Sequence, residues 1–249
     1  MKLMLQTWRS SPAAAHVAPF AVFMAFLAVP GWFRVENPEL PWHVRAPELW
    51  VYPLQTLVCA GLLLFFRRHY ALRPWRGLGL ACALGVAGIA LWILPAWTYQ
   101  KLDTENPPVW WAWLGMADRS RGFDPGQLAE WPVWERITIF MRFARLVVVV
   151  PLVEEIFWRG FLMRWLAAEG RPWHETPFGA HTWRSFWIVT TLVMLAHQPA
   201  DWPAAFVWGA LVYLAAARTR SLGACVLMHA LANALLGAWV MGAKQWGFW

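Results

Sequence analysis

A short run of charges interrupts one of the most apolar parts of the sequence. The stretch PLVEEIFWRGF, residues 151–161, places Glu154, Glu155 and Arg159 directly after RLVVVV. Residues four apart share one face of a helix, so Glu155 can pair with Arg159, whereas Glu154 is turned about 100° away. The spacing therefore predicts one neutralised carboxylate and a second one, Glu154, that is left to do chemistry.

Other polar residues lie at a matching depth in two later apolar stretches. His229 and Asn233 are four residues apart and can reach one point, and His197 lies near the end of the preceding stretch. Measured from the arginine at the near end of each stretch, at about 1.5 Å per residue, Glu154 and these three residues lie roughly 14–20 Å deep. The sequence thus predicts a polar chamber that holds a carboxylate, two imidazoles and a carboxamide.

The composition shows which environment surrounds these residues. Of the 249 residues, 59% are hydrophobic and 14% are charged, with a mean hydropathy of +0.41; soluble proteins are about half apolar and a quarter charged. The 22 tryptophans often stand at the ends of apolar runs, as interfacial anchors do. The net charge of +7 comes from arginines in short connectors, which disfavours nucleic acid binding. The three cysteines show no CxxC spacing, so neither a disulfide framework nor a thiolate metal site is expected.

Hydropathy predicts an all-α polytopic membrane bundle of seven or eight spans within one domain, residues 1–249. The basic connector 67–76 favours a cytoplasmic amino terminus and second connector, and residues 98–136 are expected to form an external cap. Arg136, Arg142 and Arg145 then lie on the outer side, against the charge rule. The expected spans are 14–33, 48–66, 77–97, 138–166, 183–198, 203–217 and 221–241.

The charged run and the later polar pair resemble a known family. EEIFWR, residues 154–159, fits the EExxxR motif, and HALAN, residues 229–233, fits the HxxxN motif, of the CAAX-processing and bacteriocin-processing intramembrane proteases. His197 fits the histidine of the middle motif, although Val193 stands where the family usually has phenylalanine. The resemblance covers about residues 140–241. It also extends to the CAAX-protease-related branch that accompanies bacterial exosortase systems.

The resemblance implies an intramembrane endopeptidase, a family whose prenyl-protein members remove the last three residues after a prenylated cysteine. In this reading Glu154 activates a water, and His197 positions that water or shares its proton. His229 and Asn233 donate hydrogen bonds to the oxyanion on the scissile carbonyl. Glu155 and Arg159 have a supporting role. No cofactor is expected.

Two alternatives remain open. In a zinc hydrolase, Glu154, His197 and His229 would be the three protein ligands of an open tetrahedral site, although HExxH is absent from the sequence. In a non-catalytic scaffold or transporter-like protein, the same chamber would hold a proton or a ligand. We expect an integral protein of a bacterial inner membrane whose partners are the lipid bilayer and a peptide or protein substrate, lipidated or not. Nothing in the sequence identifies that substrate.

Overall fold

The computed structural model describes residues 7–35, 37 and 39–249, and within these ranges the chain is helical and contains no strand. The prediction of an all-α protein is therefore confirmed. The chain forms two compact units. Unit 1 comprises the residues up to Tyr70 together with Phe123–Phe157, and unit 2 comprises Ala71–Gly122 and Trp158–Trp249. The expected cytoplasmic amino terminus concerns residues 1–6, which lie outside the described ranges.

Five of the expected spans are helices long and apolar enough to cross a membrane, counted over the described residues. Each begins and ends within a few residues of its predicted bounds, as apolar runs flanked by Pro, Gly or Arg dictate. These helices are α2 (Pro12–Phe33), α4 (Glu48–Phe66), α5 (Leu78–Leu102), α10 (Trp202–Thr219) and α11 (Leu222–Ala243). The protein is therefore integral to a membrane.

The other two expected spans need correction. The segment predicted at 138–166 begins earlier, because Pro132 suits the first helical turn. It consists of α6 (Pro132–Ala144), a π-helical turn (Arg145–Val149), α7 (Val150–Glu155), a second π-helical stretch (Ile156–Leu162) and α8 (Met163–Leu166). The span predicted at 183–198 is a shorter helix, α9 (Trp183–Leu195). Its 13 residues reach only about 20 Å, less than the roughly 30 Å hydrocarbon core.

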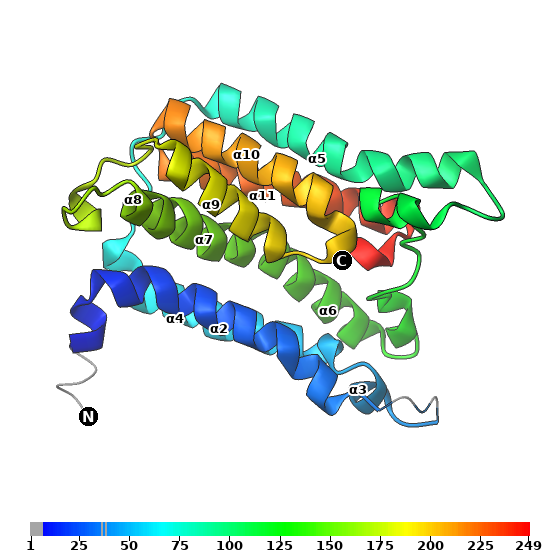
Figure 1. The fold of residues 1–249 in the computed structure, drawn as a ribbon. Helices are drawn as coiled ribbons and strands as arrows, with labels where there is room; N and C mark the ends of the chain where they lie inside the picture. The colour runs from blue at the N-terminus through cyan, green and yellow to red at the C-terminus, as the bar shows by residue number, and fades with distance from the viewer. Residues whose placement is uncertain (1–6, 36, 38) are drawn as a thin grey trace. The chain divides into compact units, whose positions relative to one another are not determined.

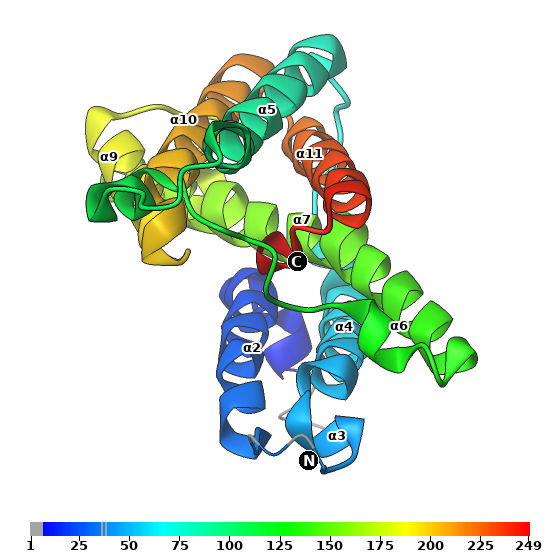
Figure 2. The same ribbon diagram turned by 90° about the vertical axis from the view of Figure 1, so that its right-hand side faces the viewer.

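In unit 1, α4 packs against both α2 and α6, and α2 and α4 run side by side in Figures 1 and 2. A buried amide holds the first two together: Gln55 on α4 is fully buried and donates from Nε2 to the Phe23 carbonyl of α2 at 2.7 Å. On the other side of α4, Thr138 and Arg142 of α6 are also buried.

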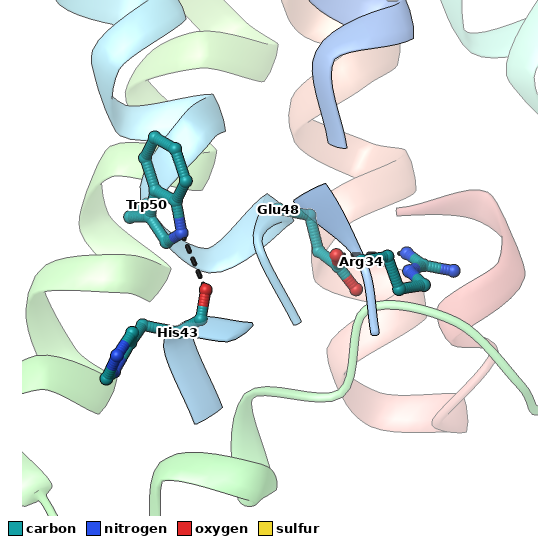
Figure 3. A network of polar contacts seen from close by, with 4 residues as sticks. All are labelled: Arg34, His43, Glu48 and Trp50. Carbon is teal, nitrogen blue, oxygen red and sulfur yellow. Dashed lines mark hydrogen bonds and ion pairs between the residues drawn. The ribbon is translucent and has the colours of Figure 1, made fainter. Parts of the chain in front are cut away.

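One end of unit 1 is built from aromatic rings and a small polar network. Trp50 donates from Nε1 to the His43 carbonyl of the short helix α3 (Trp42–Arg45), and Arg34 pairs with Glu48, both at 2.9 Å (Figure 3). A hollow of about 470 Å³ lies here, and Glu154 is not part of its lining. The hollow is lined by Phe33, Trp42, His43, Val44 and Trp50.

In unit 2, α5 packs along α10 and α11, and α9 packs on α10 (Figure 1). The approach of α5 is close because glycine stands at the contacts. A Cβ on Gly85 would meet the Met228 carbonyl oxygen of α11 at 2.9 Å, and one on Gly88 would meet the Trp208 ring of α10 at 2.8 Å. These small residues let the helices touch through backbone, as small residues do at membrane interfaces.

The expected external cap, residues 98–136, is mostly irregular, and its last part belongs to α6. Within unit 2 it includes a 3-10 helix, Val109–Leu114, and a segment that contacts the carboxyl end of the chain. Gly247 donates its backbone N–H to the Arg119 carbonyl at 2.7 Å, and the Arg119 guanidinium lies 4.9 Å from the Phe248 ring. Arg119 is thereby buried although it belongs to a connector.

Candidate active site

The two carboxylates lie on α7 in unit 1, one sealed and one accessible. Glu155 is fully buried, whereas Glu154 is half-buried. Glu154 also lies close enough to Arg145 for its charge to stabilise that guanidinium. The two glutamates thus differ in exposure, and the charge of Glu154 interacts with Arg145, a residue that the motif does not contain.

The helix that carries these carboxylates departs from regular α geometry on both sides. The backbone N–H of Val150 bonds the Arg145 carbonyl, an i to i+5 bond, and residues Ile156–Leu162 are π-helical as well. The regular 100° steps used to place side chains from the sequence therefore hold only over α7 itself. π-helical turns are rare and occur often at functional sites.

Arg159 lies in unit 2, where it is almost fully buried. Its Nη2 donates to the Gly209 carbonyl of α10 at 3.2 Å. A guanidinium at this position ties the π-helical stretch to α10 through a charge-assisted bond. The predicted pairing of Glu155 with Arg159 stays a prediction.

His197 lies beyond the helix that was expected to carry it, because α9 ends at Leu195. Its ring is held by contacts instead. Nδ1 lies 2.7 Å from the Val193 carbonyl, an acceptor only, so Nδ1 carries a proton and Nε2 is the nitrogen left for chemistry in the neutral ring. The Trp92 ring meets the imidazole edge-on at 5.2 Å, and Trp202 donates from Nε1 to the His197 carbonyl at 3.1 Å.

A buried ion pair stands near this turn. Arg119 donates from Nη2 to Asp201 Oδ1 at 2.6 Å, and both side chains are largely buried. Asp201 also lies close enough to His197 for their charges to interact. Sequence reasoning missed this pair, because Arg119 and Asp201 are 82 residues apart and each alone is typical of a solvated connector. The one available signal was the acid at the start of a helix in QPADWP.

His229 and Asn233 lie one turn apart on α11 in unit 2, as the spacing predicted, and both are buried at 5% and 9% exposure. The His229 ring meets the Trp208 ring of α10 at 5.3 Å, edge to face. This contact orients the imidazole from a neighbouring helix. Both residues can donate hydrogen bonds toward the same point on the face of α11.

Unit 1 contains two buried arginines that the site prediction did not include. Arg142 and Arg145 are 4% and 8% exposed. The sequence marked them only as positive charges on the wrong side of the membrane. In the structure they lie against Tyr52, with guanidinium-to-ring distances of 4.7 and 4.6 Å.

No group of three His, Cys, Asp or Glu side chains suited to a metal ion is found among the residues that the structure describes. The zinc alternative, with Glu154, His197 and His229 as ligands, thus gains no support from a preformed cluster there. It stays a prediction, and metal analysis of the purified protein tests it.

The segment that carries the candidate residues matches the model of a known family. Residues 136–235 match the family model of the Rce1-like type II CAAX prenyl endopeptidases. This part of the chain is therefore similar to the CAAX protease family. The match spans both carboxylates, Arg159 and the three residues proposed from later stretches. No curated protein and no solved structure gives a significant match.

The similarity supports, at the level of the family only, a CAAX-type intramembrane protease. The helices of the segment agree with a membrane enzyme. The exosortase-associated branch stays a prediction.

Proposed function

We propose that this protein is a glutamate-dependent intramembrane endopeptidase that cleaves a peptide, lipidated or not, near the carboxyl terminus of its substrate. Glu154 removes a proton from a water molecule. The resulting hydroxide attacks the scissile carbonyl and forms a tetrahedral intermediate, which collapses with protonation of the leaving amine. His197 positions the water or passes the proton on.

The oxyanion of the tetrahedral intermediate needs donors, and we assign that role to His229 and Asn233. Losing one such donor typically lowers the rate by about 10²–10³-fold. Arg159 is assigned a positioning role, because a guanidinium that bonds the α10 backbone fixes the stretch that follows the two carboxylates.

The observation that carries the proposal is the contrast between Glu154 and Glu155. Two adjacent carboxylates stand inside the matched segment, and Glu154 is half-buried whereas Glu155 is fully buried. Ionisable groups in spanning segments are costly and generally functional, so an accessible carboxylate here is the best candidate for the base.

A single substitution tests the assignment. Glu154→Gln keeps the shape of the side chain but removes the base, so cleavage of a prenylated-cysteine peptide with three further residues should be abolished. Its melting temperature should stay near the wild-type value, because a neutral amide is less costly to bury than a carboxylate. Mass spectrometry of the products identifies the new carboxyl terminus.

Glu130→Gln is the matched control, because Glu130 is an exposed acid of the same unit. It should cleave like the wild type. An active, stable Glu154→Gln protein would show that these carboxylates do not cut peptides. Inactivation of the wild type by chelators, with activity restored by zinc, would favour the metal alternative instead.

We further propose a bacterial inner membrane as the location, with the amino terminus in the cytoplasm. The support is the basic connector 67–76, which carries four arginines and no acid.

A further inference from the structure

The buried arginines of unit 1 stand in a wall of aromatic rings. Arg145 lies 5.0 Å from the Phe23 ring and 4.6 Å from Tyr52, and Arg142 lies 4.7 Å from Tyr52 and 4.5 Å from Phe123. Ring faces stabilise cations, more so where water is excluded. The two guanidinium groups are thus held in place by rings from α2, α4 and the segment before α6.

Arg145 is oriented by a buried relay. Its Nε donates to Gln55 Oε1 at 2.7 Å, and Gln55 Nε2 in turn donates to the Phe23 carbonyl at 2.7 Å. Because Gln55 is fully buried, this relay fixes both the amide and the guanidinium. Nη1 and Nη2 of Arg145 make no further hydrogen bond to residues 7–35, 37 or 39–249. These two nitrogens can therefore donate hydrogen bonds to a ligand.

The two buried arginines of unit 1 place positive charge where an anion could bind. Arg142 and Arg145 are three residues apart, and like charges on one helix face repel. The Arg34–Glu48 ion pair of unit 1 does not include Arg145. Glu154 is the acid of this unit whose charge reaches Arg145. A buried guanidinium with a free fork suits bidentate recognition of a carboxylate.

We propose that Arg145, with the positive charge of Arg142 beside it, binds the terminal carboxylate of the peptide that Glu154 cleaves. This inference rests on the proposed function, since it adds the specificity-determining residue of the same site. Arg145 and Glu154 lie nine residues apart on one helical segment that includes a π-helical turn, and their charges are close enough to interact.

The test compares two forms of one probe, a prenylated-cysteine peptide with three apolar residues after the cysteine, ending in a carboxylate or in an amide. The wild type should cleave the acid with a kcat/KM about 10- to 100-fold above that of the amide, the range that a charged hydrogen-bonded pair gives. Arg145→Gln should lower cleavage of the acid far more than cleavage of the amide, and so bring this ratio close to one. Arg145→Lys should keep part of the preference, because it keeps the charge and loses the fork.

Arg34→Gln is the matched control, because it removes an arginine from the same unit at the Arg34–Glu48 pair (Figure 3). It should leave the acid-to-amide ratio unchanged. An equal loss of kcat/KM on the acid and the amide peptide in a folded Arg145→Gln protein would overturn the inference. It would mean that Arg145 acts only through its charge interaction with Glu154.

A binding measurement separates this inference from the proposed function. Fluorescence polarisation with the labelled acid and amide peptides on Glu154→Gln protein reports carboxylate recognition without cleavage. A preference for the acid that disappears in the Glu154→Gln, Arg145→Gln double variant supports the inference even if no peptide is ever cut. Equal binding of the acid and the amide peptides would overturn the inference and leave Glu154-dependent cleavage intact. So would a result in which Arg145→Gln weakens binding of the protein to phosphatidylglycerol vesicles but leaves peptide binding unchanged.

Discussion

Replacement of Arg159 by alanine should lower the stability of the protein and its activity together. Arg159 is 1% exposed and donates to the Gly209 carbonyl, and the sequence pairs it with Glu155, which is fully buried. On the predicted pairing, removing the guanidinium would leave the Glu155 carboxylate buried without this countercharge.

The size of the loss follows from this burial. Breaking a buried pair by removing one partner typically costs about 3–5 kcal/mol in the free energy of unfolding. For a chain of this length, each kcal/mol corresponds to about 2–4 °C, so the melting temperature should fall by about 6–20 °C.

The assay is thermal unfolding in detergent beside cleavage of the peptide probe, for the Arg159→Ala variant and for a double variant, Glu155→Met with Arg159→Met. The double variant removes both charges at similar volume and should recover most of the lost stability, because two apolar side chains often replace a buried pair without loss. Glu154→Gln is the stable comparison.

Two results would refute the reasoning. A melting temperature of Arg159→Ala within about 2 °C of the wild type would mean that no buried charge was stranded. A double variant as unstable as the single one would mean that Arg159 stabilises through other contacts, such as the bond to the α10 backbone.

Three further outcomes are expected. Asn233→Ala should lower kcat for the peptide probe by about 10²–10³-fold with a smaller change in KM, measured by steady-state kinetics. Gly85→Val should cost about 1–3 kcal/mol by overpacking, because its Cβ would meet the Met228 carbonyl, and the melting temperature reports it; a neutral effect would mean that α5 can move away from α11. A reporter fused within residues 67–76 should be cytoplasmic, and one at Asn106 should be external; the reverse at both places would invert the topology.

The sequence predicted the helices well where one signal dominates. Long apolar runs with charged ends define α2, α4, α5, α10 and α11, and no tertiary contact is needed to find them. The sequence did not predict where α9 ends, because hydropathy alone does not show where a helix stops. The apolar run continues to Ala196, but α9 ends at Leu195 and His197 lies beyond it.

Within the site, local spacing predicted the relative positions of some residues but not the pairing of residues far apart in the sequence. The i to i+4 spacing placed His229 and Asn233 one turn apart on α11, but it did not show that Glu154 is half-buried and Glu155 fully buried. The Arg119–Asp201 pair and the Gln55–Arg145 bond join residues 82 and 90 positions apart. Such pairs depend on how elements pack, so a single sequence gives no means of matching them.

The π-helical turn at Arg145–Val149 affects which changes the chain can tolerate. An i to i+5 turn holds one residue more than an i to i+4 turn, so it acts as a one-residue insertion in an otherwise regular helix. Exchanging one valine for another apolar residue there leaves the count intact. Deleting one would restore the i to i+4 turn and leave one residue fewer between Arg145 and Glu154. Over evolution, this segment should accept new side chains freely and yet keep its length fixed.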